Sequence, residues 1–168
     1  MFSYNAFEHL PDPAATFGEM RRVLRPGGVG FVSFAGLGWS PEGAHLTQVT
    51  GVPYANVLFS PETIDAFRRE CAPNAWVPWI NAWPIDRFRS LFRSAHDVET
   101  LEYVETRNLF HLDVLARFLP HVRHAPSWDA LVVDSVRFVF RRLAREPVPR
   151  PRRDASAGVA APARRALA

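Results

Sequence analysis

Hydrophobic positions near the start of the chain change from helical to strand spacing. In residues 12–24 they recur at helical intervals, as at Phe17 and Met20, behind an Asp-Pro pair that supplies an N-cap and a first-turn proline. A Pro-Gly-Gly turn follows, and the apolar run 29–35 predicts a strand buried on both faces, as in a parallel sheet. Residues 2–4 resemble the end of another buried strand. Together these segments predict a right-handed strand–helix–strand crossover.

The pattern farther along predicts more helices and two further strands. Residues 36–59 are rich in Gly and Pro and are expected to form loops. Alternating polarity in 97–105 predicts a strand with one solvated face, and 131–140 predicts the last strand. We expect all four strands to form one sheet, with the first two parallel, the second and last buried, and the third partly exposed. The last two strands can form an antiparallel edge.

Three helices are expected between these strands. One begins at Ser60-Pro61, and a second runs from Pro84 to Arg93 with an apolar side. A third can be capped by Asn108, and its apolar stripe would comprise Leu109, Leu112, Ala116 and Leu119.

The length and composition indicate one globular domain. The 168 residues are 48% hydrophobic, which is enough for a sizeable core. A single cysteine, Cys71, excludes a disulfide framework and a cysteine-based zinc site, and it fits a reducing, cytoplasmic setting. No apolar run approaches the roughly 20 residues of a membrane helix, and no signal-peptide pattern follows Met1.

The charge is unevenly distributed along the chain. The net charge is +3 and all 20 basic residues are arginine, but six of these arginines lie in 145–168 beside only two acidic residues. Residues 1–144 therefore carry a net charge of −1, which argues against nucleic-acid binding. The Arg-, Pro- and Ala-rich segment 145–168 has no periodic apolar pattern and is predicted to be a disordered tail.

One ordered series of motifs points to a family. The stretch "SYNAFEHLPDPAATFGEMRRVLRPGGVGFVSF" resembles the middle of class I S-adenosylmethionine-dependent methyltransferases, from the end of the fourth strand through the fifth. The match is close over 1–35 and weaker to about 143, with an insert after the fifth strand at about 36–84. The resemblance implies an α/β fold with part of a doubly wound, Rossmann-like sheet.

The chain departs from the family where the cofactor binds. The family holds S-adenosylmethionine mainly through its first three strands, with a glycine-rich loop and an acidic residue for the ribose. No G-x-G-x-G pattern occurs in this chain. The resemblance therefore implies that residues 1–144 correspond to the C-terminal half of a methyltransferase domain, without its first three strands, and that this half alone is inactive. A non-catalytic orphan or partner-binding half-domain is the alternative.

The resemblance also implies where the cofactor and a metal would bind. Ser3, Tyr4 and Asn5 would line the methionine part of S-adenosylmethionine, although a plain strand-to-loop transition is the alternative. Some relatives carry E-x-x-E-H here and bind magnesium with the help of a later histidine. Asn5 replaces the first glutamate, so we expect no metal and a structural or substrate-orienting role for Glu8 and His9.

The remaining candidates concern catalysis and the acceptor. His45 in "SPEGAHL" can transfer protons near neutral pH and joins His9 as a candidate catalytic residue, although a packing role is the alternative. Five aromatic residues can wall an apolar substrate pocket or pack the insert onto the sheet: Trp39, Tyr54, Trp76, Trp79 and Trp83. The expected partner is a small-molecule or cell-envelope acceptor, and the sequence carries no indication of oligomeric state.

Overall fold

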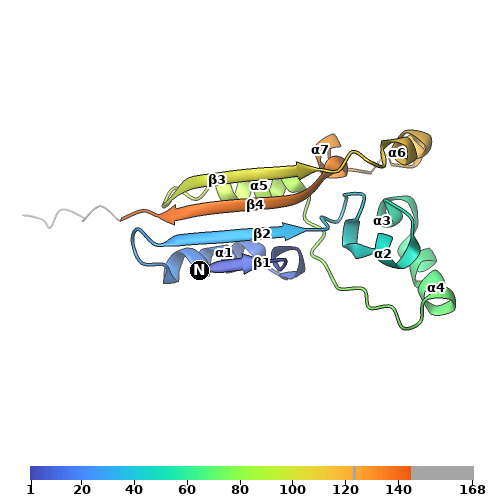
Figure 1. The fold of residues 1–168 in the computed structure, drawn as a ribbon, viewed down its shortest axis with the longest axis horizontal. Helices are drawn as coiled ribbons and strands as arrows, with labels where there is room; N and C mark the ends of the chain where they lie inside the picture. Colours follow the sequence, from blue (N-terminus) through green and yellow to red (C-terminus); the bar gives the residue numbers. More distant parts are fainter. Residues whose placement is uncertain (123, 145–168) are drawn as a thin grey trace, which may run out of the picture.

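The computed structural model describes residues 1–122 and 124–144, which form a mixed α/β fold (Figure 1). The predicted tail at 145–168 lies outside the described residues. Four strands form one sheet in the order β1-β2-β4-β3. They are β1 (Phe2–Tyr4), β2 (Val29–Ala35), β3 (Val98–Arg107) and β4 (Val133–Arg142). β1 and β2 are parallel, as predicted, and together with the helix between them they form the expected crossover.

The last strand lies inside the sheet. β4 pairs antiparallel with β2 on one side and with β3 on the other, so Phe138 faces both Val32 and Tyr103. The expected antiparallel pairing of the last two strands is confirmed, and β3 forms the edge. β2 and β3 consequently run in the same direction, separated by β4.

Two helices cover one face of the sheet and form an aromatic core with it. Pro13–Val23 forms α1, and Asp12 caps it by accepting a hydrogen bond from the Ala15 amide at 2.9 Å. Ile85–Arg93 forms α5, which buries its apolar side as expected. Phe92 of α5 stacks on Phe138 with ring centroids 4.4 Å apart and meets Phe17 edge to face at 5.3 Å. These contacts join α1, α5 and β4 in one core.

The prediction that 29–35 is buried on both faces is wrong. Val32 and Phe34 are buried, whereas Phe31 is half-buried and Val29 is 45% exposed. The reason is that α1 and α5 both contribute to the core on the same face of the sheet. The opposite face carries cross-strand ion pairs, such as that of Arg137 with Glu102 at 2.7 Å.

The insert after β2 contains more helix than expected. Residues 36–59 hold the one-turn helices η2 (Gly43–His45), α2 (Thr47–Thr50) and α3 (Ala55–Leu58), so the expectation of loop alone is wrong. The predicted helix at Ser60-Pro61 is confirmed as α4 (Pro61–Cys71). The Ser60 hydroxyl caps α4 by accepting a hydrogen bond from the Thr63 amide at 3.3 Å.

The connection from β3 to β4 contains α6 (Leu112–Phe118), η3 (Leu119–His121) and α7 (Trp128–Val132). Asn108 does not cap α6, because its side chain accepts from the Phe110 amide ahead of the helix. The predicted stripe is also wrong, because Leu109 and Leu119 are more than half exposed and Leu115 is the buried residue. Figure 1 shows α6 and the helices of the insert grouped beyond the same end of the sheet.

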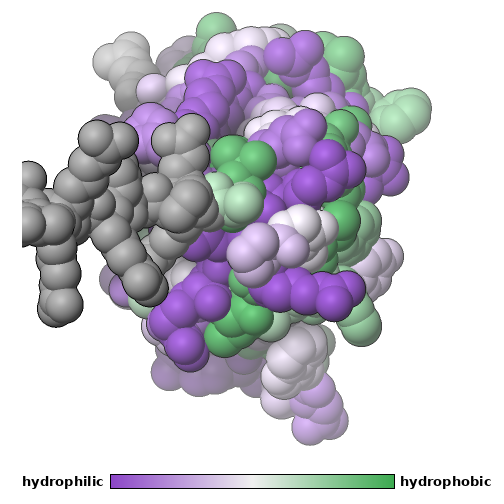
Figure 2. All heavy atoms as spheres, turned by 90° about the vertical axis from the view of Figure 1, so that its left-hand side faces the viewer, coloured by the Kyte–Doolittle hydropathy of each residue, from purple (hydrophilic) through white to green (hydrophobic). Residues whose placement is uncertain are grey.

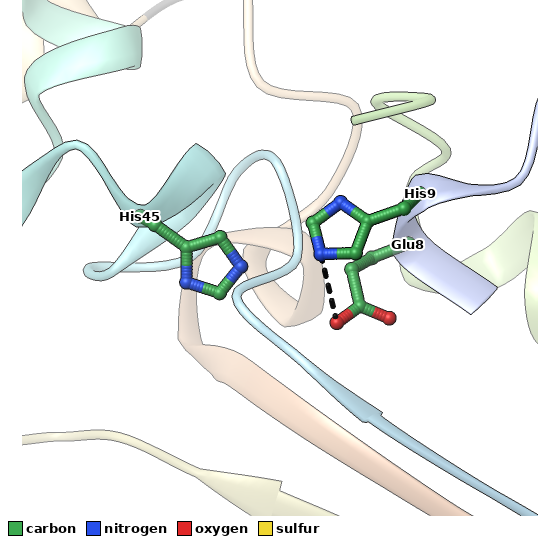
Figure 3. A group of neighbouring side chains, drawn as sticks. All are labelled: Glu8, His9 and His45. Carbon is green, nitrogen blue, oxygen red and sulfur yellow. Dashed lines mark ion pairs between the residues drawn. The ribbon is translucent and has the colours of Figure 1, made fainter. Parts of the chain in front are cut away.

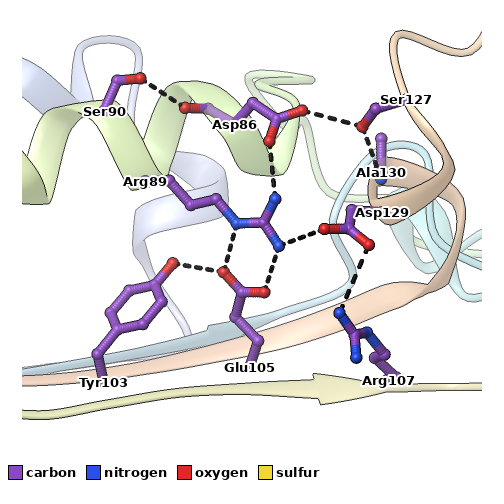
Figure 4. Close-up of polar contacts among 9 residues, drawn as sticks. All are labelled: Asp86, Arg89, Ser90, Tyr103, Glu105, Arg107, Ser127, Asp129 and Ala130. Carbon is purple, nitrogen blue, oxygen red and sulfur yellow. Dashed lines mark hydrogen bonds and ion pairs between the residues drawn. The ribbon is translucent and has the colours of Figure 1, made fainter.

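An ion-pair network fastens α5 and α7 to β3 (Figure 4). The guanidinium of Arg89 donates to both carboxylate oxygens of Glu105, at 2.7 and 2.5 Å. It also donates to Asp129 at 2.7 Å and to Asp86 at 2.8 Å. Tyr103 completes the network by donating to Glu105 at 2.7 Å. One side chain therefore links three elements that are far apart in sequence.

The two ends of the sheet differ in character. Figure 2 shows the end where the chain passes from β4 towards residue 145, and hydrophilic side chains cover most of its visible surface. The insert lies beyond the other end of the sheet (Figure 1), next to the carboxyl end of β2. Among the described residues, no helix combines the length and apolar character needed to cross a membrane.

Candidate functional site

Unusual backbone geometry gathers around the carboxyl ends of the two parallel strands. Five non-glycine residues of the described ranges have φ between 47° and 60°: Asn5, Ala44, His45, Tyr54 and Ala82. The first follows β1 directly, and the other four lie in the insert. Each such conformation costs of order 1–3 kcal/mol, and conformations of this kind cluster at functional sites. Ligands also bind at the carboxyl ends of parallel strands, so this end of the sheet is the place to look for a site.

Glu8 and His9 occupy the short helix η1 (Phe7–His9), which follows β1. Glu8 is only 2% exposed, and neither of its carboxylate oxygens has a hydrogen-bond partner in the part of the chain that the structure describes. Burial raises the pKa of this carboxyl group above its ordinary value. Glu8 therefore keeps its proton to a higher pH than an exposed carboxyl group does.

The ring of His9 has a defined orientation (Figure 3). Its Nδ1 lies 2.8 Å from the backbone carbonyl oxygen of Trp79. A carbonyl can only accept, so Nδ1 carries the proton and donates it in this contact. The other nitrogen, Nε2, lies 3.5 Å from Oε1 of Glu8. His9 thus offers Nε2 to Glu8, or to a ligand that lies between them.

The fold brings His45 next to His9. Their ring centroids are 5.5 Å apart, although 35 residues separate them in sequence. His45 follows Ala44 in a second consecutive left-handed conformation, and its ring packs on Gly36. A Cβ added at Gly36 would lie 2.9 Å from Cε1 of His45. Only glycine lets the backbone pass so close to this ring.

The electrostatic surroundings favour a neutral His45. Burial and the neighbouring His9 lower its pKa below the ordinary value, while Glu42 and Asp134 oppose this shift. A half-buried imidazole that is unprotonated near neutral pH can accept a proton. The site therefore combines a carboxyl group of raised pKa with an imidazole that can accept a proton.

Glu8, His9 and His45 present one carboxylate oxygen and two imidazole nitrogens within 4.8 Å of one another. This spacing suits a shared proton and would also allow a shared metal ion. Magnesium prefers oxygen ligands, so a set with two nitrogens fits it poorly. The expectation that no metal binds here stays a prediction.

The residues expected to contact the cofactor lie at the same end of the sheet. The Asn5 amide donates to the Ser33 carbonyl at 2.8 Å, which extends the pairing of β1 with β2. Tyr4 is 66% exposed, and Ser3 is half-buried. Their expected contact with S-adenosylmethionine stays a prediction, and the sequence contains no G-x-G-x-G loop to accompany them. The residues present thus do not complete a site for this cofactor.

Sequence reasoning missed a second polar group beside His45. The Ser40 hydroxyl donates to Oδ1 of Asp134 at 2.8 Å, and both Ser40 and Tyr54 are fully buried. Burial and the charge of Asp134 raise the pKa of Tyr54 to about 12, and its hydroxyl has no hydrogen-bond partner among residues 1–122 and 124–144. Ser40 and Asp134 are 94 residues apart, so no local pattern signals their contact.

The five aromatic candidates divide between packing and exposure. Tyr54 and Trp83 are buried, and Trp39 packs partly against the main core. Trp76 and Trp79 are 80% and 61% exposed, so they form no closed pocket wall. Trp79 nevertheless contributes to the site through its backbone carbonyl, which holds His9.

Comparisons with known proteins support the methyltransferase resemblance at the start of the chain. Residues 1–32 match the family model for a methyltransferase domain, which confirms the resemblance to class I methyltransferases for this segment. The structure is similar to a crystal structure described as a sarcosine dimethylglycine methyltransferase from Galdieria sulphuraria, with a TM-score of 0.40 and 16% identity. The similarity covers 84% of this chain and 52% of that one, so the chain spans about half of its length. A search of curated proteins found no match.

Proposed function

We propose that residues 1–144 form the C-terminal, acceptor-side half of an S-adenosylmethionine-dependent methyltransferase domain, with the insert at about 36–84. The observation that carries this proposal is the family match over 1–32. That match ends within β2, and the Glu8–His9–His45 group lies between the carboxyl ends of β1 and β2 and the insert. The expected acceptor is a small molecule or a cell-envelope compound.

The residues of this chain would act on the acceptor's proton. S-adenosylmethionine, when bound, supplies an electrophilic methyl group. His45 takes the proton from the attacking group of the acceptor, because its pKa is lowered and its imidazole is neutral near neutral pH. His9, oriented by the Trp79 carbonyl, lies beside His45 and contributes to its lowered pKa, which keeps the base neutral before this transfer. Positioning of the acceptor contributes the rest of the catalysis.

We further propose that the 168-residue chain alone binds S-adenosylmethionine too weakly for methyl transfer. Ser3, Tyr4 and Asn5 supply a single wall, and the glycine-rich loop that the family uses is not encoded in this sequence. Calorimetric titration of the purified chain with S-adenosylhomocysteine tests this directly. We expect no saturable heat. A micromolar Kd, equivalent to about −8 kcal/mol, would overturn the proposal that this half is inactive alone.

A complementation experiment tests the methyltransferase proposal itself. The glycine-rich first half of a related methyltransferase is joined to this chain, and folding of the product is verified by cooperative thermal unfolding. We expect micromolar binding of S-adenosylhomocysteine and transfer of a labelled methyl group from S-adenosylmethionine. Replacement of His45 by Gln should lower the transfer rate by about 10²-fold or more with little effect on cofactor affinity. A folded product that binds no cofactor would contradict the proposal.

A partner-binding half-domain without catalysis is the second candidate. It is favoured by β1, which forms an edge of the sheet and carries Phe2 and Tyr4 at 79% and 66% exposure. An uncovered strand edge is a template for pairing with another chain. The complementation experiment separates the two candidates. If the half-domain is not catalytic, the joined product should bind the cofactor, but replacement of His45 should not change its activity.

A further inference from the structure

Two apolar cavities are lined by residues of the insert that follow His45 in the sequence. The larger has a volume of about 290 Å³ and lies between the insert and the β3–β4 connection, lined by Val52, Leu58, Phe59, Phe118 and His121. The smaller has a volume of about 180 Å³ and lies against α4, lined by Thr50, Val52, Phe59, Thr63, Ile64 and Phe67. Val52 and Phe59 line both, so the two cavities adjoin.

The chemistry of the lining selects an uncharged ligand. Among the described residues, neither cavity is lined by an Asp, Glu, Lys or Arg side chain. The two threonine hydroxyls of the smaller cavity already have partners, since Thr50 donates to the Leu46 carbonyl at 2.9 Å and Thr63 lies 3.2 Å from the Ser60 hydroxyl. Of the described residues in the two linings, His121 is the single titratable one, and it lines the larger cavity. A charged group placed in the smaller cavity would lose its hydration without gaining a partner from these residues.

The helices around the cavities leave apolar surface uncovered. No residue of α4 is buried, although Ile64 and Phe67 face the smaller cavity. Phe59 is 43% exposed and Phe118 is 39% exposed, so the mouth of the larger cavity is apolar as well. A ligand that enters would cover these rings, which gives it a favourable burial term.

The dimensions favour a small aromatic or short alkyl group. An apolar cavity of roughly 150 Å³ is enough to bind benzene, so about 180 Å³ accommodates a six-membered ring. Thr50 in the wall of the smaller cavity ends α2 (Thr47–Thr50), which begins two residues after His45. The cavity wall and the histidine pair therefore share one short segment of the insert.

We propose that these cavities bind the uncharged aryl or alkyl part of a small-molecule acceptor and leave its reactive hydroxyl or amine near His45. This inference rests on the proposed function for the identity of the bound molecule as an acceptor. The site itself, as a binding site for a neutral apolar group, is independent of the cofactor. It can therefore be tested in the full chain without S-adenosylmethionine.

The test measures binding of 4-ethylphenol, a neutral ring with a short alkyl group, by calorimetry and by ligand-observed NMR. The charged analogue 4-hydroxybenzoate serves as the second ligand. We expect saturable binding of 4-ethylphenol with a submillimolar Kd. The charged analogue should bind at least about tenfold more weakly, equivalent to about 1.4 kcal/mol.

Two matched variants locate the site. Phe59→Ser removes a ring from both cavities and should weaken 4-ethylphenol binding about tenfold. Phe110→Ser makes the same change at a ring that is 91% exposed and lines neither cavity, so it should leave the affinity unchanged. Val52→Phe, which fills both cavities without removing apolar surface, provides an independent variant and should also abolish binding.

Each contrary outcome overturns the inference. These outcomes are no saturation by 4-ethylphenol, equal affinity for 4-hydroxybenzoate, or equal effects of the Phe59 and Phe110 substitutions. Sedimentation velocity adds a further outcome, because dissociation of a dimer by Phe59→Ser would show that a second copy of the chain occupies this surface. None of these results bears on cofactor binding by the complemented enzyme, so the proposed function stands or falls separately.

Discussion

Replacing Arg89 by Met should destabilise the fold strongly, because the guanidinium holds three carboxylates on three elements. The side chain of Arg89 is 16% exposed and that of Glu105 is 14% exposed, so this pair is shielded from water. Removing one partner of a buried pair costs about 3–5 kcal/mol, since the other charge is left uncompensated. Asp129 and Asp86 are 31% and 53% exposed, and each of those contacts adds at most about 1 kcal/mol.

We therefore expect Arg89→Met to lower the free energy of unfolding by about 3–4 kcal/mol at neutral pH. Urea unfolding followed by circular dichroism measures this value. Arg22→Met is the matched control, because Arg22 pairs with Glu19 on the surface and both side chains are more than 60% exposed. Its cost should stay below about 1 kcal/mol.

The pH dependence of the loss tests the mechanism. The hydrogen bonds from Arg89 hold the pKa of Glu105 below its ordinary value. A carboxyl group with a lowered folded-state pKa stabilises the fold above its unfolded-state pKa and loses that contribution as the pH falls through the folded-state value. The difference between wild type and Arg89→Met should thus be full at neutral pH and shrink under acid conditions. A cost equal to that of Arg22→Met, or one that does not change with pH, would refute this reasoning.

Two further predictions concern the candidate site. Glu8→Gln should raise the free energy of unfolding at about pH 8 but not at about pH 4. Burial raises the pKa of Glu8, so this carboxyl group loses its stabilising contribution as the pH rises through its folded-state pKa. Urea unfolding at both pH values measures this, and a Gln variant that is less stable than wild type at the higher pH would contradict it. Gly36→Ala should cost about 1–2 kcal/mol for a left-handed φ of 68° and also displace His45. Gly51→Ala is the matched control, because Gly51 has the same φ but no atom near an added Cβ. NMR titration should show a higher pKa of His45 in the Gly36 variant, where the ring is displaced, and no change in the Gly51 variant.

Short-range signals were sufficient to predict several elements of this fold. The Asp12 cap and the following proline predicted the start of α1, and Ser60 predicted the start of α4 in the same way. A cap acts through hydrogen bonds within three residues, so its effect is contained in the local sequence. The family resemblance of residues 1–32 likewise lies in contiguous residues, where the family model finds it.

Pairing between distant segments could not be predicted in this way. The insertion of β4 between β2 and β3 follows from long-range packing, and so does the placement of both covering helices on one face. Because both helices cover the same face, the prediction that β2 is buried on both faces was wrong. Composition shows how apolar a strand is, but the neighbouring elements decide how many of its faces are covered.

The candidate site shows the same division. The sequence by itself singled out His9 and His45 as candidate catalytic residues, and it contains no G-x-G-x-G loop to accompany them. Only the tertiary structure placed their rings 5.5 Å apart, buried the Glu8 carboxyl group beside His9 and joined Ser40 to Asp134. Side-chain chemistry is a property of each residue, whereas proximity and burial depend on the closure of long loops, which is stabilised by the core as a whole.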